Sequence, residues 1–434
     1  MTEQPVPEHP ASEPILEHWK RNVALFLTGQ TVSLFGSMIV QYAVMWYVTI
    51  ETKSGVAVAL YAVAAFLPQG IVSLFGGVLA DRVNRRILVM TADAIIAAAT
   101  LVLALLMLNG ITDLWIIVLA VAIRSLGAGV QTPAVTAMIP QLTPPDQLMR
   151  INGIFGTIQS AMMLLAPAAA GVVFGVFGIV PVFFIDVVTA VIGIGILFFV
   201  TVPTLAAVAE KTTSYREDLV EGMRFIWHNP VVRWLLVIFA LIFVLVVAPS
   251  FVTPLMVARE FGAEVWKLTV LELAFSVGML LGGVAVSTFL AKRSRMALIL
   301  IATFGFGVWT IGLGFSPDLI VFYAFMFLFG LFVPLFSTPV MTLLQETVQP
   351  EMHGRVFSYV GIVMALATPV GIAVFGPLAD VISVQALLVI GGVLMVVVMV
   401  IAVLVPSGRA AIAASRLTDP AHAVADEAPE DAKP

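Results

Sequence analysis

The chain has 434 residues, of which 61% are hydrophobic and 11% are charged, whereas a soluble protein carries about 25% charged residues. This deficit extends over nearly the whole length and indicates an integral membrane protein with little soluble mass. The net charge of −5 gives no reason to expect a nucleic-acid partner, because the charges are confined to loops and tails. The absence of cysteine excludes disulfides, thiolate metal sites and cysteine nucleophiles.

Twelve apolar runs follow one another along the chain, and each is close to or above the ~20 residues that a helix needs to cross a bilayer. A backbone in lipid must satisfy its own hydrogen bonds, so these runs are predicted to be helices rather than open strands. The predicted fold is an all-α polytopic membrane protein with twelve transmembrane helices in two six-helix bundles. The predicted spans are 22–49, 55–80, 87–109, 114–139, 152–177, 181–202, 231–257, 267–291, 296–314, 318–344, 356–379 and 385–405.

Two polar ends and one polar connection interrupt this pattern. Residues 1–18 are rich in Pro and Glu and lack the basic start and apolar core of a signal peptide. The end of the chain is rich in Ala, Asp and Glu, and both ends are predicted to be disordered. The predicted domains are a tail at 1–18, an N-terminal bundle at 19–202, a cytoplasmic linker at 203–230, a C-terminal bundle at 231–406 and a tail at 407–434.

Lys and Arg residues lie mainly on one side of the predicted spans. Of the 21 such residues, 17 fall on the side of the N-terminus and three, Lys53, Arg259 and Lys267, fall on the other side. Cytoplasmic loops carry the excess of these residues, so both termini are predicted to be cytoplasmic. The expected location is the cell inner (plasma) membrane, with lipids as neighbours. The remaining basic residue, Arg124, lies inside a span.

The connection at 203–230 divides the spans six and six, and an amphipathic helix is predicted within it over Tyr215–His228. The two halves also repeat each other. A proline precedes an arginine by five residues after the fourth span, at Pro145, and after the tenth, at Pro350. Parallel repeats of this kind are typical of secondary transporters, whose site lies near the midplane between the halves.

Between the second and third spans the chain reads Gly77-Val-Leu-Ala-Asp81-Arg82-Val-Asn84-Arg85-Arg86. This stretch resembles the signature between the second and third helices of the major facilitator superfamily, with Asn84 where that family often has Gly. Asn tolerates a left-handed backbone, so the turn is expected to be kept. The resemblance implies that Gly77, Asp81, Arg82, Arg85 and Arg86 form a cytoplasmic gate, with the last two also contacting anionic headgroups. The alternative is that these charges only fix the topology.

Several shorter segments resemble the macrolide-efflux branch of the drug:proton antiporters. The Gly-Pro antiporter signature of the fifth span is present only loosely, as Ala166-Pro167 and Gly171. The resemblance implies a monomer that exports bulky amphipathic molecules in exchange for protons by alternating access. The segments include Gly29-Gln30-x-Val32-Ser33, Ile123-Arg124-Ser125, Thr132-Pro133-Ala134, Ile185-Asp186-Val187 and Gly354-Arg355-Val356-Phe357-Ser358.

Ionisable side chains inside a span are costly and are candidates for function. Arg124 lies about ten residues into the fourth span, which at ~1.5 Å per residue places it near the midplane. The resemblance implies that it faces the central cavity, where it responds to a partner carboxylate or contacts substrate. Glu272 in the eighth span is the candidate proton carrier. The alternatives are an arginine bonded to backbone carbonyls or Gln side chains, and a carboxylate held by a helix N-terminus.

Asp93 and Asp186 are predicted to have structural roles, because their helices lie toward the outside of each bundle in the superfamily. Asp93 is expected to pair with the basic end of the charged stretch. Gln41 and Gln131 are candidates for substrate contact, with hydrogen bonding between helices as the alternative reading. Trp46 and Phe275 are candidates for a pliable apolar cavity wall, and contact with lipid or a neighbouring helix is the alternative.

No P-loop pattern is present in the sequence, so ATP is not expected to drive this protein. The five histidines lie in tails or connections, so neither a metal site nor a hydrolytic triad is predicted within the membrane. No cofactor or enzymatic activity is expected. The predicted function is proton-coupled efflux of a small amphipathic substrate. The alternatives are export of a siderophore or another metabolite, proton-coupled uptake, and a sensor or lipid-moving scaffold of the same fold.

Overall fold

The computed structural model describes residues 18–202, 215–349 and 352–417, apart from the side chains at 74–82, 215–219, 248, 407, 411 and 414–417. Within this description, twelve helices are long and apolar enough to cross a membrane, which confirms the predicted all-α polytopic fold. They are α1 (Trp19–Thr52), α2 (Gly55–Arg82), α3 (Arg85–Leu108), α4 (Leu114–Leu142), α5 (Leu148–Phe177), α6 (Ile179–Phe198), α8 (Pro230–Met256), α9 (Val265–Ser287), α10 (Arg295–Gly314), α11 (Leu319–Thr347), α12 (His353–Val381) and α13 (Val384–Leu404).

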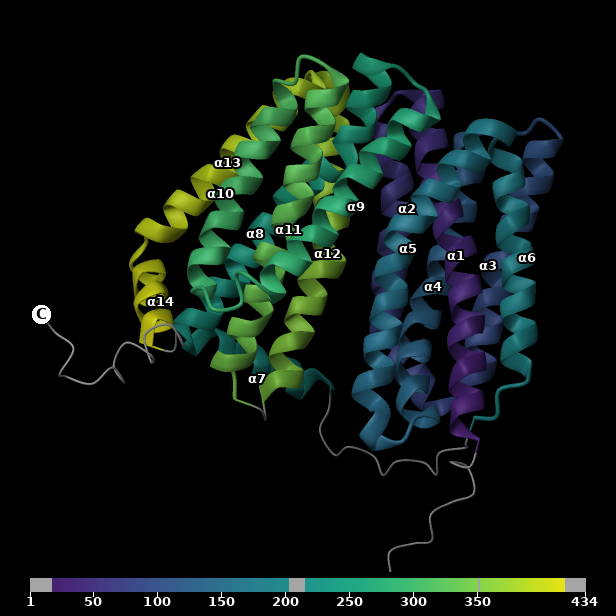
Figure 1. Ribbon diagram of the computed structural model, residues 1–434, viewed down its shortest axis with the longest axis horizontal. Helices are drawn as coiled ribbons and strands as arrows, with labels where there is room; N and C mark the ends of the chain where they lie inside the picture. The colour runs from purple at the N-terminus through teal and green to yellow at the C-terminus, as the bar shows by residue number, and fades with distance from the viewer. Residues whose placement is uncertain (1–17, 203–214, 350–351, 418–434) are drawn as a thin grey trace, which may run out of the picture.

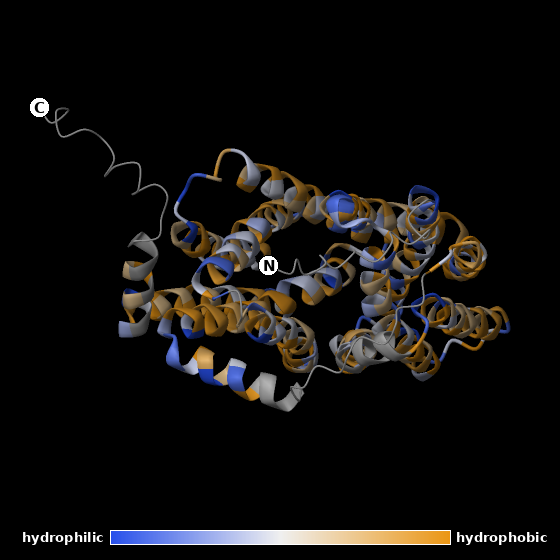
Figure 2. Ribbon diagram, turned by 90° about the horizontal axis from the view of Figure 1, so that it is seen from below, coloured by the Kyte–Doolittle hydropathy of each residue, from blue (hydrophilic) through white to orange (hydrophobic). Residues whose placement is uncertain are grey.

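These helices form two bundles that stand side by side (Figure 1). In the first bundle α2 packs on α4, and α6 packs on α1 and α3; in the second, α11 packs on α9 and α10, and α13 packs on α10. The end of the molecule at which α1 begins and α13 ends is called the terminal end here, and the opposite one the far end. Seen from the terminal end, the helices are predominantly hydrophobic along their length, as a membrane requires (Figure 2).

Two amphipathic helices lie at the terminal end. α7 (Tyr215–His228) has the bounds expected from the sequence, and Figure 2 shows it banded with hydrophilic and hydrophobic residues. Glu221 of α7 forms an ion pair with Arg355 of α12 at 3.0 Å, so α7 is attached to the second bundle.

The second of these helices is α14 (Pro406–Leu417), and it corrects the prediction that the chain is disordered from residue 407. The run 410–414 is almost entirely alanine, the residue with the highest helix propensity. Ile412 also packs against the apolar core of the second bundle. Composition alone had indicated a tail, whereas propensity together with one apolar anchor gives a helix. The predicted tails at 1–17 and 418–434 fall outside the described residues.

The two bundles contact each other in the far-end halves of their helices. α2 packs on α12 and α5 packs on α9. A Cβ on Gly55 or Gly171 would clash with Gly376 or Thr269 of the opposite bundle, so the approach is as close as small residues permit. The Ser276 hydroxyl of α9 adds a hydrogen bond to the Met163 carbonyl of α5 at 3.0 Å.

Polar contacts complete this closure at its outermost layer. The Asp380 carboxylate of α12 accepts hydrogen bonds from the backbone N–H groups of Gly55 at 2.6 Å and Val56 at 2.9 Å, and therefore caps α2 from the other bundle. Arg259 forms an ion pair with Asp380 at 2.6 Å and donates to the Lys53 carbonyl. We call this set of contacts the far-end latch.

The terminal end has no comparable closure among the described residues. One apolar core spans both bundles at the far end, whereas the terminal end contains two cores, one confined to each bundle. In the terminal half of α5, seven of the nine residues at 152–160 are exposed, so this stretch is not covered by the second bundle. Among the described residues, the bundles are therefore joined at the far end and make no comparable contact at the terminal end.

Candidate functional site

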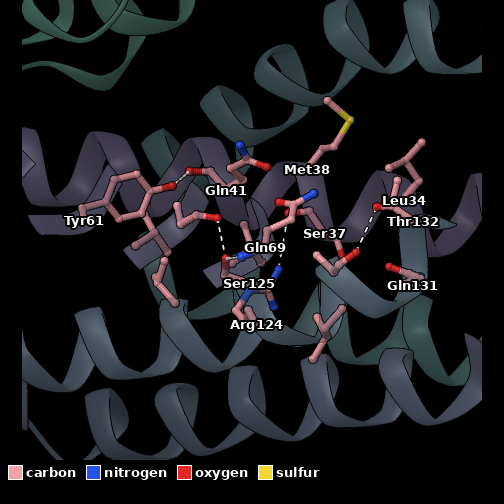
Figure 3. Close-up of a pocket in the computed structure, with 16 residues that line it drawn as sticks. Leu34, Ser37, Met38, Gln41, Tyr61, Gln69, Arg124, Ser125, Gln131 and Thr132 are labelled. Carbon is pink, nitrogen blue, oxygen red and sulfur yellow. Dashed lines mark hydrogen bonds between the residues drawn. The ribbon is translucent and has the colours of Figure 1, made fainter. Parts of the chain in front are cut away.

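A cavity of about 190 Å³ lies in the first bundle between α1, α2 and α4 (Figure 3). A second cavity of about 90 Å³ shares part of its wall and continues toward the terminal end along α1, α4 and α5. Apolar side chains such as Met38 and Val121 alternate in the lining of the first cavity with amides, hydroxyls and a guanidinium. Its polar members are Ser37, Gln41, Tyr61, Gln69, Arg124, Ser125, Gln131 and Thr132.

Pro68 interrupts α2 at the wall of this cavity. Proline has no N–H, and its ring clashes with the carbonyl four residues earlier, so the hydrogen-bond ladder of the helix is disturbed here. The Ser125 hydroxyl of α4 accepts a hydrogen bond from the Gln69 N–H at 2.9 Å and donates one to the Ala65 carbonyl at 2.7 Å. These two backbone groups would bond to each other in a regular helix. A side chain of α4 thus bonds to two backbone groups of α2 on either side of the proline, and we call this point the α2 joint.

Arg124 of α4 forms an ion pair with Asp186 of α6 and donates to the Thr100 hydroxyl of α3. The Asp186 carboxylate also accepts from Thr100 at 2.8 Å and from the Ser37 hydroxyl of α1 at 3.1 Å. The Asp186 side chain is 1% exposed and that of Arg124 12%. A buried ion pair is tolerated when further hydrogen bonds satisfy its remaining polar atoms, and the two hydroxyls do this for the carboxylate. We call these contacts the Asp186 level.

A second buried carboxylate, Asp93 of α3, lies nearer the terminal end. Its Oδ1 atom accepts from the Ser33 hydroxyl of α1 at 2.7 Å and from the side-chain amide of Gln131 of α4 at 2.5 Å. Asp93 is 2% exposed, and its Oδ2 atom has no hydrogen-bond partner among the described residues. Each carboxylate is thus held by a serine of α1 and a side chain of α4. We call this lower set the Asp93 level.

Glycines in α1 and α6 allow the hydroxyls of α1 to reach these carboxylates. A Cβ at Gly36 would clash with the Thr189 hydroxyl and would lie 3.0 Å from the Asp186 Cα, and a Cβ at Gly29 would lie 3.2 Å from the Gly193 carbonyl oxygen. Small residues permit this close contact of two helices. The packing of α1 on α6 therefore determines where along the helices, and how close to the carboxylates, the serine hydroxyls of α1 lie.

The family model described as Major Facilitator Superfamily matches residues 26–372 and 288–425 of this chain. The chain belongs to the Major Facilitator Superfamily. It is therefore a multi-pass transporter of the inner membrane, embedded in lipid and acting on a small molecule.

Relatives within the superfamily include efflux proteins. Macrolide efflux protein A of Streptococcus pyogenes is 30% identical over 387 residues, which cover 88% of this chain and 96% of that one. Multidrug efflux pump Tap of Mycolicibacterium fortuitum is 29% identical over 208 residues, 46% of this chain and 48% of that one. The solved structure of a POT family transporter in complex with a thioalcohol conjugated peptide has a TM-score of 0.71 and 12% identity, and covers 88% and 95% of the two chains. The last comparison supports the fold alone, and the first confirms the resemblance seen in the sequence.

Three of the predicted site residues of this superfamily member line the same cavity. These are Gln41, Arg124 and Gln131, and Figure 3 shows them around one space. The Gln41 side chain is exposed, and its backbone carbonyl accepts a hydrogen bond from the Tyr61 hydroxyl at 2.7 Å. Gln131 is half-buried and bound to Asp93, so it links the cavity to the buried acid.

Three other predicted residues lie away from this cavity. Trp46 is fully buried and packs against Tyr42 with 5.9 Å between ring centroids. Phe275 of α9 packs against Phe329 at 6.3 Å, within the second bundle. Glu272 of α9 is half-buried, lies on a helix that packs on α5 of the first bundle, and has no ion-pair partner among the described residues.

The predicted gate stretch is only partly described. The side chains of Gly77, Asp81 and Arg82 lie outside the described residues. Arg85 donates to the Ala137 carbonyl of α4 at 2.8 Å, and Arg86 donates to the Val200 carbonyl after α6 at 2.8 Å. The expected pairing of Asp93 with this basic end is wrong, because Asp93 lies two turns along α3 and reaches Ser33 and Gln131 instead.

Reasoning from the sequence missed Asp186 as the partner of Arg124, and Ser37 and Ser125 as polar residues of the cavity. Spacing carried a signal for some of them. Ser33 and Ser37 are four residues apart in α1, and Arg124 and Gln131 are seven apart in α4, so each pair lies on one face of its helix. Polar residues on one face of an apolar helix indicate a shared polar neighbour. The sequence does not say which other helix supplies it.

Proposed function

We propose that this protein exports bulky amphipathic molecules of the macrolide type in exchange for protons, by alternating access of a single chain. The observation that carries the proposal is a cavity with amide and hydroxyl groups in an apolar wall, in a molecule whose bundles are joined at the far end and, among the described residues, make no comparable contact at the terminal end. The similarity to Macrolide efflux protein A over 88% of the chain supports the substrate class.

The excess of Lys and Arg on the side of the termini supports a cytoplasmic terminal end. On this orientation the structure represents the state that receives substrate from the cytoplasm or the inner leaflet. Pockets for drug-sized ligands measure about 300–1,000 Å³, so the cavities of about 190 and 90 Å³ hold one part of a macrolide. The rest of the molecule lies in the opening between the bundles.

Intramembrane ionisable groups support the coupling to protons. Arg124 is at the cavity wall and paired with Asp186, and Glu272 stands beside the first bundle without an ion-pair partner among the described residues. In the proposed cycle, Glu272 takes up a proton from the outside while the far end is open, and the pairing of Arg124 responds. The gate stretch with Asp81 and Arg82 then has its role in the opposite state, in which it holds the terminal end closed.

Transport by the purified protein in proteoliposomes tests this function, with radiolabelled erythromycin as the probe. An imposed proton gradient is expected to drive accumulation, and a protonophore is expected to abolish it. Accumulation that persists unchanged after collapse of the gradient would contradict proton coupling. Glu272→Gln is expected to keep counterflow exchange of erythromycin but to lose gradient-driven accumulation, and retention of both would remove Glu272 as the carrier.

A further inference from the structure

We propose that Asp93 is a proton-binding site of the transporter, in addition to Glu272, and that it is neutral in the state open at the terminal end. This inference rests on the proposed proton coupling for its role in transport. The occupancy of the site by a proton is a separate property, which the structure supports on its own.

The first argument is the charge balance of the two levels. The charged groups that face this region from the helices packed on α3 are Arg124 of α4 and Asp186 of α6, among the described residues; α1 contributes the neutral Ser33. These described groups thus supply one guanidinium for two buried carboxylates, and the guanidinium is bonded to Asp186. An isolated buried carboxylate is strongly disfavoured unless it is paired or neutralised. Binding of one proton brings the region to net zero charge.

The second argument is the geometry of the Asp93 carboxyl group. Both of its donors, the Ser33 hydroxyl and the Gln131 amide, act on the same oxygen, Oδ1. Oδ2 is buried and has no partner among the described residues. A proton from solution that forms an O–H bond at Oδ2 removes the charge and leaves both hydrogen bonds to Oδ1 in place. The ionised form would leave a charged oxygen without a donor, which costs far more in a buried site than the neutral O–H group of the carboxylic acid.

The third argument is the route to solvent. Ser33 and Gln131 both line the smaller cavity, which continues toward the open terminal end, and Gln131 also lines the larger one. A movement of the Gln131 side chain therefore exposes Asp93 to water in the cavity. The same amide is within reach of a substrate in the larger cavity. Gln131 is thus a positioning residue between the substrate space and the proton site.

Infrared spectroscopy of the purified protein in lipid tests the occupancy of the site. The wild type is expected to show a carboxylic-acid C=O band at neutral pH that shifts on deuteration and is lost in Asp93→Asn. The same band intensity in wild type and Asp93→Asn would overturn the proposal, whatever the protein transports. Ser33→Ala is the control variant: it removes a hydrogen bond but no proton site, so the band is expected to move in frequency and to remain.

Transport of erythromycin in proteoliposomes tests the role. Asp93→Asn is expected to reduce gradient-driven accumulation at least about tenfold, the effect of losing a required intramembrane carboxyl, while counterflow exchange stays within about twofold. Retained counterflow exchange also shows that the Asp93→Asn variant is folded. Gradient-driven accumulation equal to that of the wild type would overturn the role of Asp93. Absence of gradient-driven accumulation in the wild type itself would instead contradict the proposed function, and the infrared result would still decide the proton site.

Discussion

Arg124 and Asp186 depend on each other because the carboxylate is fully buried and the guanidinium is largely so. The side chains are 12% and 1% exposed, and Thr100 and Ser37 satisfy the carboxylate further. Removal of one member of such a pair costs about 3–5 kcal/mol, because the other charge remains buried alone. Removal of both charges is much better tolerated.

Asp186→Asn is therefore expected to lower thermal stability more than the double variant Asp186→Asn with Arg124→Gln. The single variant leaves a buried guanidinium without a counterion, and the double variant leaves two neutral amides that can bond to each other. Thermal unfolding of the purified protein in detergent measures the difference. A double variant less stable than the single one would show that the two side chains are not each other's main partners.

Gln41 offers its side chain to the cavity without being buried. Gln41→Ala is expected to raise the apparent KM for erythromycin about fivefold, since a lost hydrogen bond costs about 1 kcal/mol. The maximal rate is expected to change little, because Gln41 makes none of the contacts between the bundles described above. Initial rates of transport over a range of erythromycin concentrations give both constants. Gln345→Ala, an exposed position of α11 away from the cavity, is the control, and an equal change in that variant would contradict a direct contact.

At the scale of the helix, the α2 joint divides one span into two working parts. The part before it, from Gly55, packs against α12 at the far end, and the part after it carries the gate stretch. The Ser125 hydroxyl joins the two parts with one bond to each. α4 therefore controls how the two parts of α2 are connected, at the wall of the cavity.

Ser125→Ala is expected to increase hydrogen exchange at the Gln69 amide, because its acceptor is removed and the neighbouring proline prevents a regular ladder. Exchange of peptides covering 65–69, followed by mass spectrometry, measures this directly. Ser73→Ala is the control within the same helix, since Ser73 bonds to the Gly70 carbonyl of α2 itself. Unchanged exchange in Ser125→Ala would mean that α2 closes its own ladder.

Hydropathy predicted the spans because lipid imposes the same requirement on each of them, and α7 followed from its amphipathic spacing. α14 was missed because the Asp and Glu residues that indicated a tail all lie after residue 417, while the contact of Ile412 that stabilises the helix comes from another part of the chain. Gln41, Gln131 and Arg124 were predicted as cavity residues because a polar side chain in an apolar helix needs a hydrogen-bond partner or water. The pairing of Arg124 with Asp186, 62 residues away, depends on how α3, α4 and α6 pack. The burial of Trp46 could not be predicted from the sequence, because size and aromaticity do not say which face of α1 is buried.

For the whole molecule, closure at the far end depends on apolar packing and on the far-end latch. Asp380 accepts hydrogen bonds from α2 and from Arg259, and loss of a helix cap typically costs about 1 kcal/mol. Because the capping residue lies in the other bundle, its bonds stabilise the closed far end relative to the open one and not α2 alone.

Asp380→Ala is expected to shift this equilibrium toward an open far end by about fivefold, the ratio that corresponds to the loss of about 1 kcal/mol for a removed cap. The native sequence has no cysteine, so spin labels can be placed at Ile111→Cys and Phe315→Cys, one in each bundle. Electron–electron resonance between the labels measures the populations of short and long distances.

Asp318→Ala serves as the matched control for this experiment. Asp318 caps α11 at the same end, with bonds to the backbone N–H groups of Ile320 and Val321 of its own helix. This variant is expected to leave the distance populations unchanged. An equal shift in both variants would mean that capping stabilises the helices and not the contact between bundles.

The far-end latch also has a consequence for the divergence of sequences in this branch of the superfamily. On the first bundle it uses mainly backbone groups, the N–H of Gly55 and Val56 and the carbonyl of Lys53. Backbone groups survive almost any substitution, so mutation removes the latch most directly through Arg259 or Asp380. Homologues that keep the latch are expected to vary at 53 among residues that tolerate its left-handed backbone, with a φ of 46°. They are expected to exclude only proline at 56 and to retain the acid and the guanidinium. Selection to keep this contact would then be visible mainly in the second bundle, which supplies Arg259 and Asp380.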